Sequence, residues 1–302
     1  MLTRRALAAL AVAVLTATLP GCRAGSEGSP TATTPSATHA SSPAPTAGPD
    51  ETVLGVLGDF GTARSEAPRV VARMARFAGD RPLAAVITTG DNAYPSGRPA
   101  EVVRARAYLN PLLRRGTRLV ASLGNHDVAT DGGRPAQRGL DMPARWYTTT
   151  VGPLEVVVLD SNRTGDGAQL AFLRRVLLTQ RTPFRAVVFH HPPAACSHHA
   201  GDTNVRRRWL PLLKGRIDLL LAGHNHTYER FLGDGGIPWI TTGGGGAPLY
   251  PSLLTRCSGG AAPVLVRTVH HALRLRVTPT RLTVEAIGTD GAVFDRVVSA
   301  PR

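Results

Sequence analysis

The sequence predicts an α/β fold in which two packed sheets are flanked by helices, and two observations support this. Short apolar stretches alternate with stretches of helical spacing from residue 51 onward. Several of the apolar stretches also end directly at Asp, Asn or His, in most cases after a glycine. Because polar groups at the carboxyl ends of strands gather at one edge of an α/β sheet, we expect these side chains to lie together.

The predicted strands are short apolar runs. Five of them lead straight into a polar segment that contains Asp, Asn or His: residues 52–57, 83–89, 118–123, 186–189 and 217–222. Further strands are predicted for residues 155–159, 239–242, 264–270, 273–277 and 282–287. Helical spacing of apolar residues predicts helices over residues 67–77, 101–113, 168–178 and 205–213. We find no internal repeat.

The N-terminal segment reads as processing information. Residues 1–5 are basic, residues 6–19 are apolar, and Cys22 follows a glycine. This pattern predicts an export signal over residues 1–22 that resembles a bacterial lipoprotein signal, in which Cys22 would carry a lipid. Arg4-Arg5 also resembles a twin-arginine signal. The sequence leaves open whether the exported protein is a lipid-anchored surface protein or is freely secreted, and a lipid on Cys22 would be its only link to a membrane.

Residues 23–50 are Ser, Thr, Pro, Ala and Gly with almost no large apolar side chain, which is typical of a disordered tether. The remaining residues, 51–302, are predicted to form one catalytic domain, since they are numerous enough for one sizeable core.

The chain carries a formal net charge of +14. Its arginines are spread along the whole length, and no block of five or six like charges appears. We therefore do not expect nucleic acid as the main partner, and interpret the charge as favouring anionic substrates or surfaces.

Candidate metal ligands occur in five short segments: Gly58-Asp59-Phe60-Gly61, Gly90-Asp91-Asn92-Ala93-Tyr94, Gly124-Asn125-His126-Asp127, the end of Val187-Val188-Phe189-His190, and Gly223-His224-Asn225-His226. Taken singly, an aspartate after a glycine is more often a turn or capping residue, and a tyrosine more often belongs to the core. Taken together, two carboxylates, an amide, a phenol and several imidazoles, each after its own apolar run, favour a dinuclear metal site.

The histidine pairs differ in what they indicate. His224 and His226 are two residues apart, so on an extended strand both would point to the same side, as ligands of adjacent metals would. His190 and His191 are neighbours and on one strand would point to opposite faces, so at most one of them should bind metal.

At this point the chain resembles the calcineurin-like metallophosphoesterases and, within them, the purple acid phosphatases of the tartrate-resistant type. The resemblance covers roughly residues 53–229, with all five segments in the family's order. Tyr94 completes a Gly-Asp-x-x-Tyr block, whereas Gly61 stands where many relatives carry a metal-binding histidine. The resemblance implies a four-layer α-β-β-α sandwich of two mixed sheets.

The resemblance also implies the metal centre. Asp59, Asp91, Tyr94 and His226 would hold Fe(III), because binding a phenol as phenolate at acid pH requires a strongly Lewis-acidic ion. Asp91 would bridge to a divalent ion, Fe, Zn or Mn, bound by Asn125, His190 and His224. His190 is preferred because it aligns as the first residue of His-x-Pro, although His191-Pro192 also fits. We therefore expect hydrolysis of phosphomonoesters by attack of a metal-bound hydroxide.

His126 and His199 are the expected catalytic histidines, which would hold the phosphate and protonate the leaving group. His126 lies in the third segment, directly after Asn125. His199 lies nine residues after His190, where animal-type members place a substrate histidine, with His198 as a competitor. Whether Cys196 and Cys257 form a disulfide remains open at this level.

Two other functions remain as alternatives: a metal-dependent phosphodiesterase or nucleotidase of the same fold, and a surface binding protein that lost catalysis. Other enzyme signals are weak. The glycines at 243–246 lack the Lys-Ser/Thr of a phosphate-binding loop, Asp59-Phe60-Gly61 lacks the other kinase segments, and no Gly-x-Ser-x-Gly occurs. The sequence names neither the natural substrate nor the second metal nor the oligomeric state.

Overall fold

The computed structural model describes residues 50–179, 182–251 and 257–302. The predicted export signal lies outside these residues, as does the predicted tether except for Asp50. In the described ranges, no helix has the length and apolar character needed to cross a membrane.

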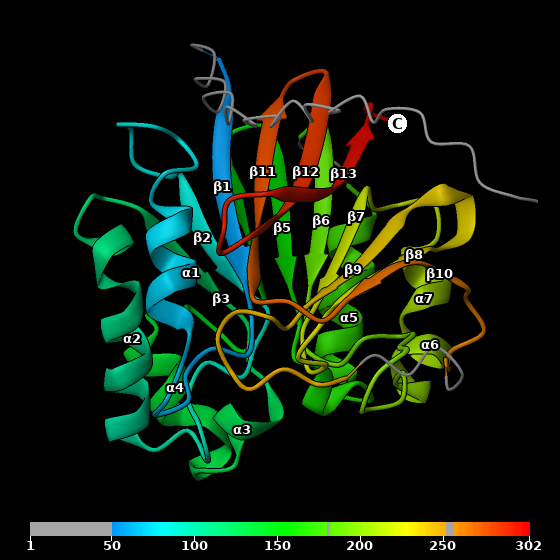
Figure 1. The fold of residues 1–302 in the computed structure, drawn as a ribbon. Coiled ribbons are helices and arrows are strands. Elements are labelled where there is room, and N and C mark those ends of the chain that lie inside the picture. The colour runs from blue at the N-terminus through cyan, green and yellow to red at the C-terminus, as the bar shows by residue number, and fades with distance from the viewer. Residues whose placement is uncertain (1–49, 180–181, 252–256) are drawn as a thin grey trace, which may run out of the picture. The chain divides into compact units, whose positions relative to one another are not determined.

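The first sheet has six strands in the order β13-β12-β11-β1-β2-β3 (Figure 1). Strands β1, β2 and β3 run parallel, and β11 pairs antiparallel with β1. The bounds of these strands are β1 Thr52–Leu57, β2 Ala85–Thr88, β3 Arg118–Ala121, β11 His271–Thr278, β12 Arg281–Gly288 and β13 Val293–Ser299.

The second sheet has seven strands in the order β10-β8-β9-β7-β6-β5-β4. Strands β5, β6, β7 and β9 run parallel, whereas β4, β8 and β10 pair antiparallel with their neighbours. The bounds are β4 Tyr147–Val151, β5 Leu154–Val158, β6 Phe184–Val188, β7 Leu219–Ala222, β8 Tyr228–Leu232, β9 Pro238–Thr242 and β10 Pro263–Arg267.

Helices cover the outer face of each sheet (Figure 1). Helices α1, α2 and α4 contribute to the core on the first sheet, and α5, α6 and α7 to the core on the second. The helices are α1 Ala67–Met74, α2 Pro99–Leu113, α3 Asn125–Val128, α4 Arg134–Gly139, α5 Gly167–Leu177, α6 Thr203–Arg208 and α7 Leu210–Leu213. Short 3₁₀ turns occupy Asp131–Gly133, Ser161–Arg163 and Asp234–Gly236.

The alternation of side chains along the strands builds the layers. In β1, Leu54 and Val56 join the core between the two sheets, whereas Val53 and Leu57 join the core beneath α1 and α2. This follows from the two-residue period of a strand, because both faces of a central strand are covered by apolar partners. The predicted four-layer α-β-β-α sandwich is thus confirmed.

Several predicted elements differ in detail. The predicted helix over residues 205–213 is interrupted at Trp209, because Pro211 has no N–H to donate to the preceding turn. Strands β4, β8 and β13 were not predicted. Strand β13 is half-exposed along its length, so it shows none of the apolar periodicity on which the prediction relied.

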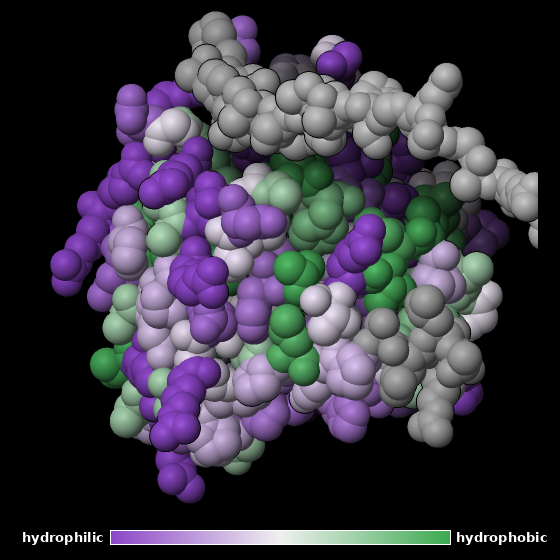
Figure 2. Space-filling view, in the orientation of Figure 1, coloured by the Kyte–Doolittle hydropathy of each residue, from purple (hydrophilic) through white to green (hydrophobic). Residues whose placement is uncertain are grey.

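Large exposed apolar side chains are scattered along the chain, for example Val103 on α2 and Val298 on β13. In the view of Figure 2, the surface over α1 and α2 is mainly hydrophilic, and the hydrophobic patches lie nearer the middle of this face. Single exposed apolar residues of this kind are ordinary on soluble domains and indicate no site by themselves.

Buried His271 gives the fold a predictable response to acid. Its Nε2 lies 3.0 Å from Thr242 Oγ1, and its Nδ1 lies 2.9 Å from the Val269 carbonyl oxygen. Burial lowers the pKa of His271 to about 4, against 6.5 for the free side chain. Because the folded state disfavours the charged form, stability is lost as the pH falls from about 6.5 toward about 4.

We predict that His271→Gln flattens this acid-side loss of stability. Between pH 7 and about pH 4.5, the free energy of unfolding of the wild type should fall by about 2 kcal/mol more than that of the variant. Urea unfolding of both proteins at the two pH values measures this difference, and all other titrating groups cancel in it. Equal losses in both proteins would show that His271 does not set the acid response.

Candidate metal centre

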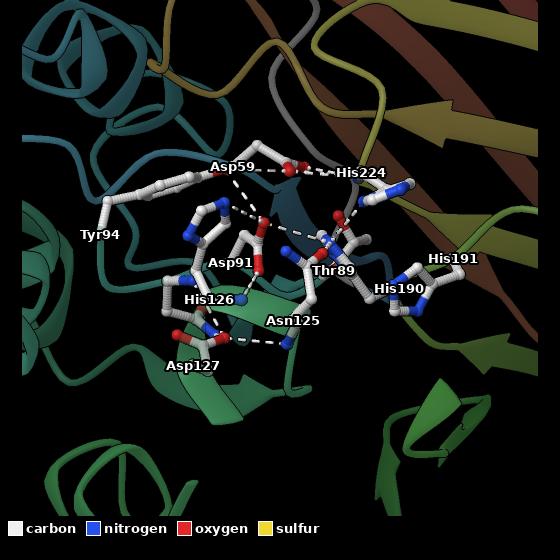
Figure 3. Close-up of polar contacts among 12 residues, drawn as sticks. Asp59, Thr89, Asp91, Tyr94, Asn125, His126, Asp127, His190, His191 and His224 are labelled. Atoms are coloured by element: carbon white, nitrogen blue, oxygen red, sulfur yellow. Dashed lines mark hydrogen bonds and ion pairs between the residues drawn. The ribbon is translucent and has the colours of Figure 1, made fainter. Parts of the chain in front are cut away.

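All seven predicted metal ligands meet at the edge of the fold where β1, β2, β3, β6 and β7 end. Figure 3 shows Asp59, Asp91, Tyr94, Asn125, His190 and His224 among them. A continuous set of contacts of 3.0 to 3.6 Å links Asp59, Asp91, Tyr94, Asn125, His190, His224 and His226. The carboxyl ends of parallel strands from both sheets therefore bring together residues that lie up to 167 positions apart (Asp59 to His226).

The backbone at three of these positions is turned into the left-handed region. The φ angles are +57° at Asp59, +49° at Asp91 and +72° at His224. This region is unfavourable for residues with a side chain, and such strain is typically found at functional sites. The turns direct the side chains that follow β1, β2 and β7 toward one another.

Two of the motif glycines are required by close approach to the aspartates. A Cβ atom at Gly124 would lie 2.1 Å from Asp91 Oδ1, and one at Gly223 would lie 2.5 Å from Asp59 Oδ2. Any side chain at these positions would displace a carboxylate from the site. The glycines of Gly-Asn-His-Asp and Gly-His-Asn-His therefore serve the packing of the site itself.

The Tyr94 hydroxyl faces three acceptor groups at once. It lies 3.3 Å from Asp59 Oδ1, 3.2 Å from Asp91 Oδ2 and 3.1 Å from His226 Nε2. A phenol carries a single proton, so it can satisfy only one of the three. Burial and the two carboxylates raise the pKa of Tyr94 well above 10 in the absence of a cation.

A second crowded atom is Nε2 of His190. It lies 3.0 Å from Asn125 Oδ1, 3.2 Å from Asp91 Oδ2 and 3.2 Å from His224 Nδ1. The other ring nitrogen, Nδ1, contacts the Thr89 carbonyl oxygen at 2.9 Å, which orients it as a donor. His226 is held in the same way, with its Nδ1 2.7 Å from the Pro248 carbonyl oxygen. In both rings this contact directs Nε2 into the site, as metal-binding histidines require.

The electrostatics of the site call for positive charge. Burial raises the pKa of Asp59 well above its usual value. Burial also opposes ionisation of Asp91, but His190 and His126 outweigh it and lower that pKa. His190 in turn has its pKa raised to about 9, because the neighbouring Asp91 outweighs the effect of burial. Without a cation, a proton on His190 is therefore the main positive charge facing two buried carboxylates.

These observations fit metal ions at both crowded points. The Tyr94 hydroxyl faces three acceptor atoms, and so does Nε2 of His190. Each of these two atoms carries at most one proton, so the acceptors outnumber the protons at both points. Oxygen and imidazole donors of this kind suit Fe, Zn and Mn. The sets Asp59–Asp91–His190 and His190–His191–His224 each bring their donor atoms within 4.8 Å of one another, so Asp91 lies where it can serve both ions.

Neither histidine pair lies on an extended strand, so the arguments that place two side chains on the same side or on opposite faces of a strand do not apply. Strand β7 ends at Ala222, so His224 and His226 lie on a turn rather than an extended strand, and both still reach the site. Strand β6 ends at Val188, so His190 and His191 also lie beyond it. The His191 ring lies 4.6 Å from that of His224 and its Nδ1 contacts Ser161 Oγ at 2.8 Å, so both neighbouring histidines face the site.

The two predicted catalytic histidines lie beside the ligands. His126 is partly exposed, its Nδ1 is 2.6 Å from the Pro95 carbonyl oxygen, and its Nε2 is 3.9 Å from Asp91 Oδ2. His199 is half-buried, and its ring stacks on that of His224 at 4.1 Å. His198 is exposed and contacts His199 and Tyr250 rather than a metal ligand. The geometry therefore favours His199 over His198.

Three residues at the site were not predicted. Asp127, fully buried, accepts bonds from the main-chain N–H groups of Asn92, Ala93 and Gly124 and so ties two of the motif turns together. Tyr250 stacks on the His226 ring at 4.0 Å. Asn225 lies buried between two ligands. Asp127 belongs to a recognisable motif, but Tyr250 lies outside every motif, and only the fold places it here.

The loop that carries His199 is fixed to the rest of the fold. Cys196 and Cys257 form a disulfide, which settles the pairing left open by the sequence. The main-chain N–H of Cys196 also donates to Glu229 Oε2 at 3.0 Å, and Ala195 pairs with Ser258. The loop therefore has covalent and hydrogen-bonded supports close to His199.

Comparison with known proteins matches most of the described chain to a family. The model of the family described as calcineurin-like phosphoesterase matches residues 52–228. Purple acid phosphatase 17 of Arabidopsis thaliana is 25% identical over 228 residues, which span 63% of this chain and 67% of that protein. Purple acid phosphatase 4 of the same plant is 24% identical over 230 residues, with the same coverage of both proteins.

Solved structures show the same fold. The chain resembles GAP50, described as the anchor in the inner membrane complex of Plasmodium, with a TM-score of 0.66 and 15% identity over 83% of this chain and 89% of that one. It also resembles the structure of PhoD, with a TM-score of 0.55 and 10% identity over 86% of this chain and 70% of that one.

We predict that Asp91→Asn lowers the metal content of the purified protein to well below two ions per chain. A neutral amide cannot join two cations as a carboxylate does, and one of the two buried charges is lost. Elemental analysis by mass spectrometry measures the content. Asp141→Asn, a change at an exposed carboxylate paired with Arg106, is the matched control and should leave it unchanged. Two bound ions in Asp91→Asn would contradict the assignment of Asp91 as the shared ligand.

Proposed function

The chain belongs to the calcineurin-like phosphoesterase family of metal-dependent hydrolases, and on this premise we propose that it hydrolyses phosphomonoesters at a dinuclear centre of Fe(III) and a divalent ion. The observation that carries the proposal is the position of Tyr94. Its hydroxyl faces both buried aspartates and His226, at the place where one of the two ions would bind.

The presence of a phenol in the donor set supports Fe(III). Burial and the carboxylates raise the pKa of Tyr94 far above the pH of any cellular compartment, so only a strongly Lewis-acidic ion would hold it as phenolate. Asp59, Asp91, Tyr94 and His226 would bind this ion. Asp91, Asn125, His190 and His224 would bind the divalent ion, for which Fe, Zn and Mn all suit the donors.

When bound, the two ions would act as Lewis acids that attract the phosphate and lower the pKa of water at the site. The protein itself would orient the substrate and handle protons. The His126 ring is held by the Pro95 carbonyl oxygen, and its Nε2 lies 3.9 Å from Asp91 Oδ2. His199, stacked on His224, would donate a proton to the leaving group or bind the phosphate from the other side.

The charge of the site supports a small phosphorylated substrate. Fe(III) and a divalent ion exceed the charge of two aspartates and one phenolate, so an anion is attracted to the centre. The excess of arginine over the whole chain acts in the same direction. We do not propose nucleic acid as the main partner, because the positive charge is not gathered in a block.

We place the activity outside the cytoplasm, on the basis of the predicted signal over residues 1–22. A lipid on Cys22 would hold the enzyme at the cell surface, and residues 23–50 would act as the tether. Without the lipid the protein would be secreted. The disulfide between Cys196 and Cys257 is consistent with export, since such bonds persist in oxidising compartments.

The alternative enzyme is a phosphodiesterase or nucleotidase that uses Mn or Zn at the same ligands. This enzyme would use the same residues as the phosphatase, but its activity would not depend on Tyr94. A binding protein without catalysis is less well supported, because such a protein needs no complete set of converging donors. The similarity to GAP50 shows the fold alone.

The oxidised wild-type protein is predicted to be pink to purple, with a visible charge-transfer band that Tyr94→Phe loses. It should hydrolyse p-nitrophenyl phosphate much faster than the bis-ester, with an acidic optimum, because Fe(III) ionises bound water at lower pH than a divalent ion does. Absorbance spectra and parallel assays on the two esters measure both. Tyr108→Phe, at a half-buried tyrosine away from the ligands, is the matched control and should stay coloured. A colourless, metal-loaded wild type that prefers the bis-ester near neutral pH would favour the alternative enzyme.

A further inference from the structure

Asn225 stands out among the residues that the proposed chemistry does not use. It is fully buried and lies between the two metal ligands His224 and His226. Its side chain does not contact any of the seven ligands through a hydrogen bond. Instead, Oδ1 accepts the main-chain N–H of His199 at 2.9 Å, and Nδ2 donates to the main-chain carbonyl oxygen of His199 at 3.0 Å.

These two hydrogen bonds hold the main chain of His199 in the way that a neighbouring β-strand would. A side-chain amide that binds both the N–H and the C=O of one residue fixes the position and the direction of its backbone. Because Asn225 belongs to the turn that carries His224 and His226, the bonds tie His199 directly to the metal-binding turn. The stacking of the His199 ring on His224 at 4.1 Å, with 25° between the planes, fits this arrangement.

The other supports of the loop act at a distance from His199. The disulfide, Glu229 and the pairing with Ser258 hold residues 195 and 196, and Ser258 Oγ accepts the N–H of Gly201 at 2.7 Å. Between these supports lie His198, which is exposed, and His199 itself. Asn225 therefore supplies the only side-chain hydrogen bonds to the His199 main chain among the described contacts.

We propose that Asn225 is a positioning residue that places the His199 imidazole beside the metal centre and thereby supports protonation of poor leaving groups. The proposal rests on the phosphatase function proposed above. It assigns a role to the residue between the two histidines of Gly-His-Asn-His, which would otherwise only fill the core. A purely structural amide would also be buried and hydrogen-bonded, so the experiment must separate the two roles.

A double-mutant cycle with His199 makes this separation. The variants are Asn225→Ala, His199→Ala and the double variant, assayed on an alkyl phosphate and on p-nitrophenyl phosphate. Each single change should lower kcat on the alkyl ester by roughly 10²-fold and have a smaller effect on p-nitrophenyl phosphate, which needs little proton donation. The double variant should be no more than about threefold slower than His199→Ala, because both changes remove the same contribution.

The control is Gln169→Ala. Gln169 is also fully buried, and its amide also makes two bonds to the main chain of one residue: Oε1 accepts from Asp160 N–H at 2.7 Å, and Nε2 donates to the Asp160 carbonyl at 3.1 Å. Gln169→Ala should lower the melting temperature about as much as Asn225→Ala does. Any effect on kcat should multiply with that of His199→Ala, since the two residues share no contact.

Asn225→Asp provides a second variant if the alanine variant folds poorly. A carboxylate keeps the acceptor for the His199 N–H and loses the donor for its carbonyl. We expect a smaller loss of kcat that again disappears in the His199→Ala background. Independent, multiplicative losses from Asn225 and His199 would overturn the proposal, as would loss of metal from either Asn225 variant, since Asn225 would then serve His224 and His226.

A measurement that does not depend on catalysis tests the role of Asn225 separately from the proposed phosphatase function. In zinc-reconstituted protein with ¹³C-labelled histidine, the His199 imidazole signal, assigned by its absence in His199→Ala, should carry the ring-current shift of its stack on His224. Asn225→Ala should remove that shift, and Gln169→Ala should keep it. An unchanged signal in Asn225→Ala would overturn the proposal, whereas a wild type without phosphatase activity but with this response would refute only the proposed function.

Discussion

Repulsion among buried lone pairs is the constraint on which the rest of the site depends. Asp59 and Asp91 are removed from water, the Tyr94 hydroxyl contacts both of them, and Nε2 of His190 contacts Asp91 and the side-chain oxygen of Asn125. Such an arrangement is costly unless positive charge fills its centre. A proton on His190 supplies part of that charge, and two metal ions would supply the rest. Metal binding and the local fold should therefore stabilise each other.

The sandwich makes this arrangement possible because it is rigid on both sides of the site. The core between the sheets and the two cores beneath the helices fix the strands, and each ligand follows a strand end within a few residues. The strained turns at Asp59, Asp91 and His224 are held by this frame. Supporting contacts from Thr89, Pro248 and Asp127 then orient the rings and turns, so the site depends on a second layer of polar groups.

Much of this could be predicted from the sequence, and the limits have physical causes. Two packed sheets flanked by helices followed from the alternation of apolar and helical stretches, and the seven predicted ligands followed from the family resemblance of the motifs after the strands. Loop geometry did not follow, because the left-handed turn at His224 depends on tertiary contacts. For the same reason Tyr250 and Asn225 were missed as parts of the site. Their roles depend on how distant loops meet, which no local pattern records.

The central claim is that the seven converging side chains form a site for two cations. The most direct test is the number of metal ions bound per chain in the purified protein, measured by elemental analysis against the protein concentration. We predict about two ions per chain, with iron as one of them. A protein that is folded and active with no more than one ion per chain would contradict the account, because one cation leaves either Tyr94 or His190 facing unpaired donors.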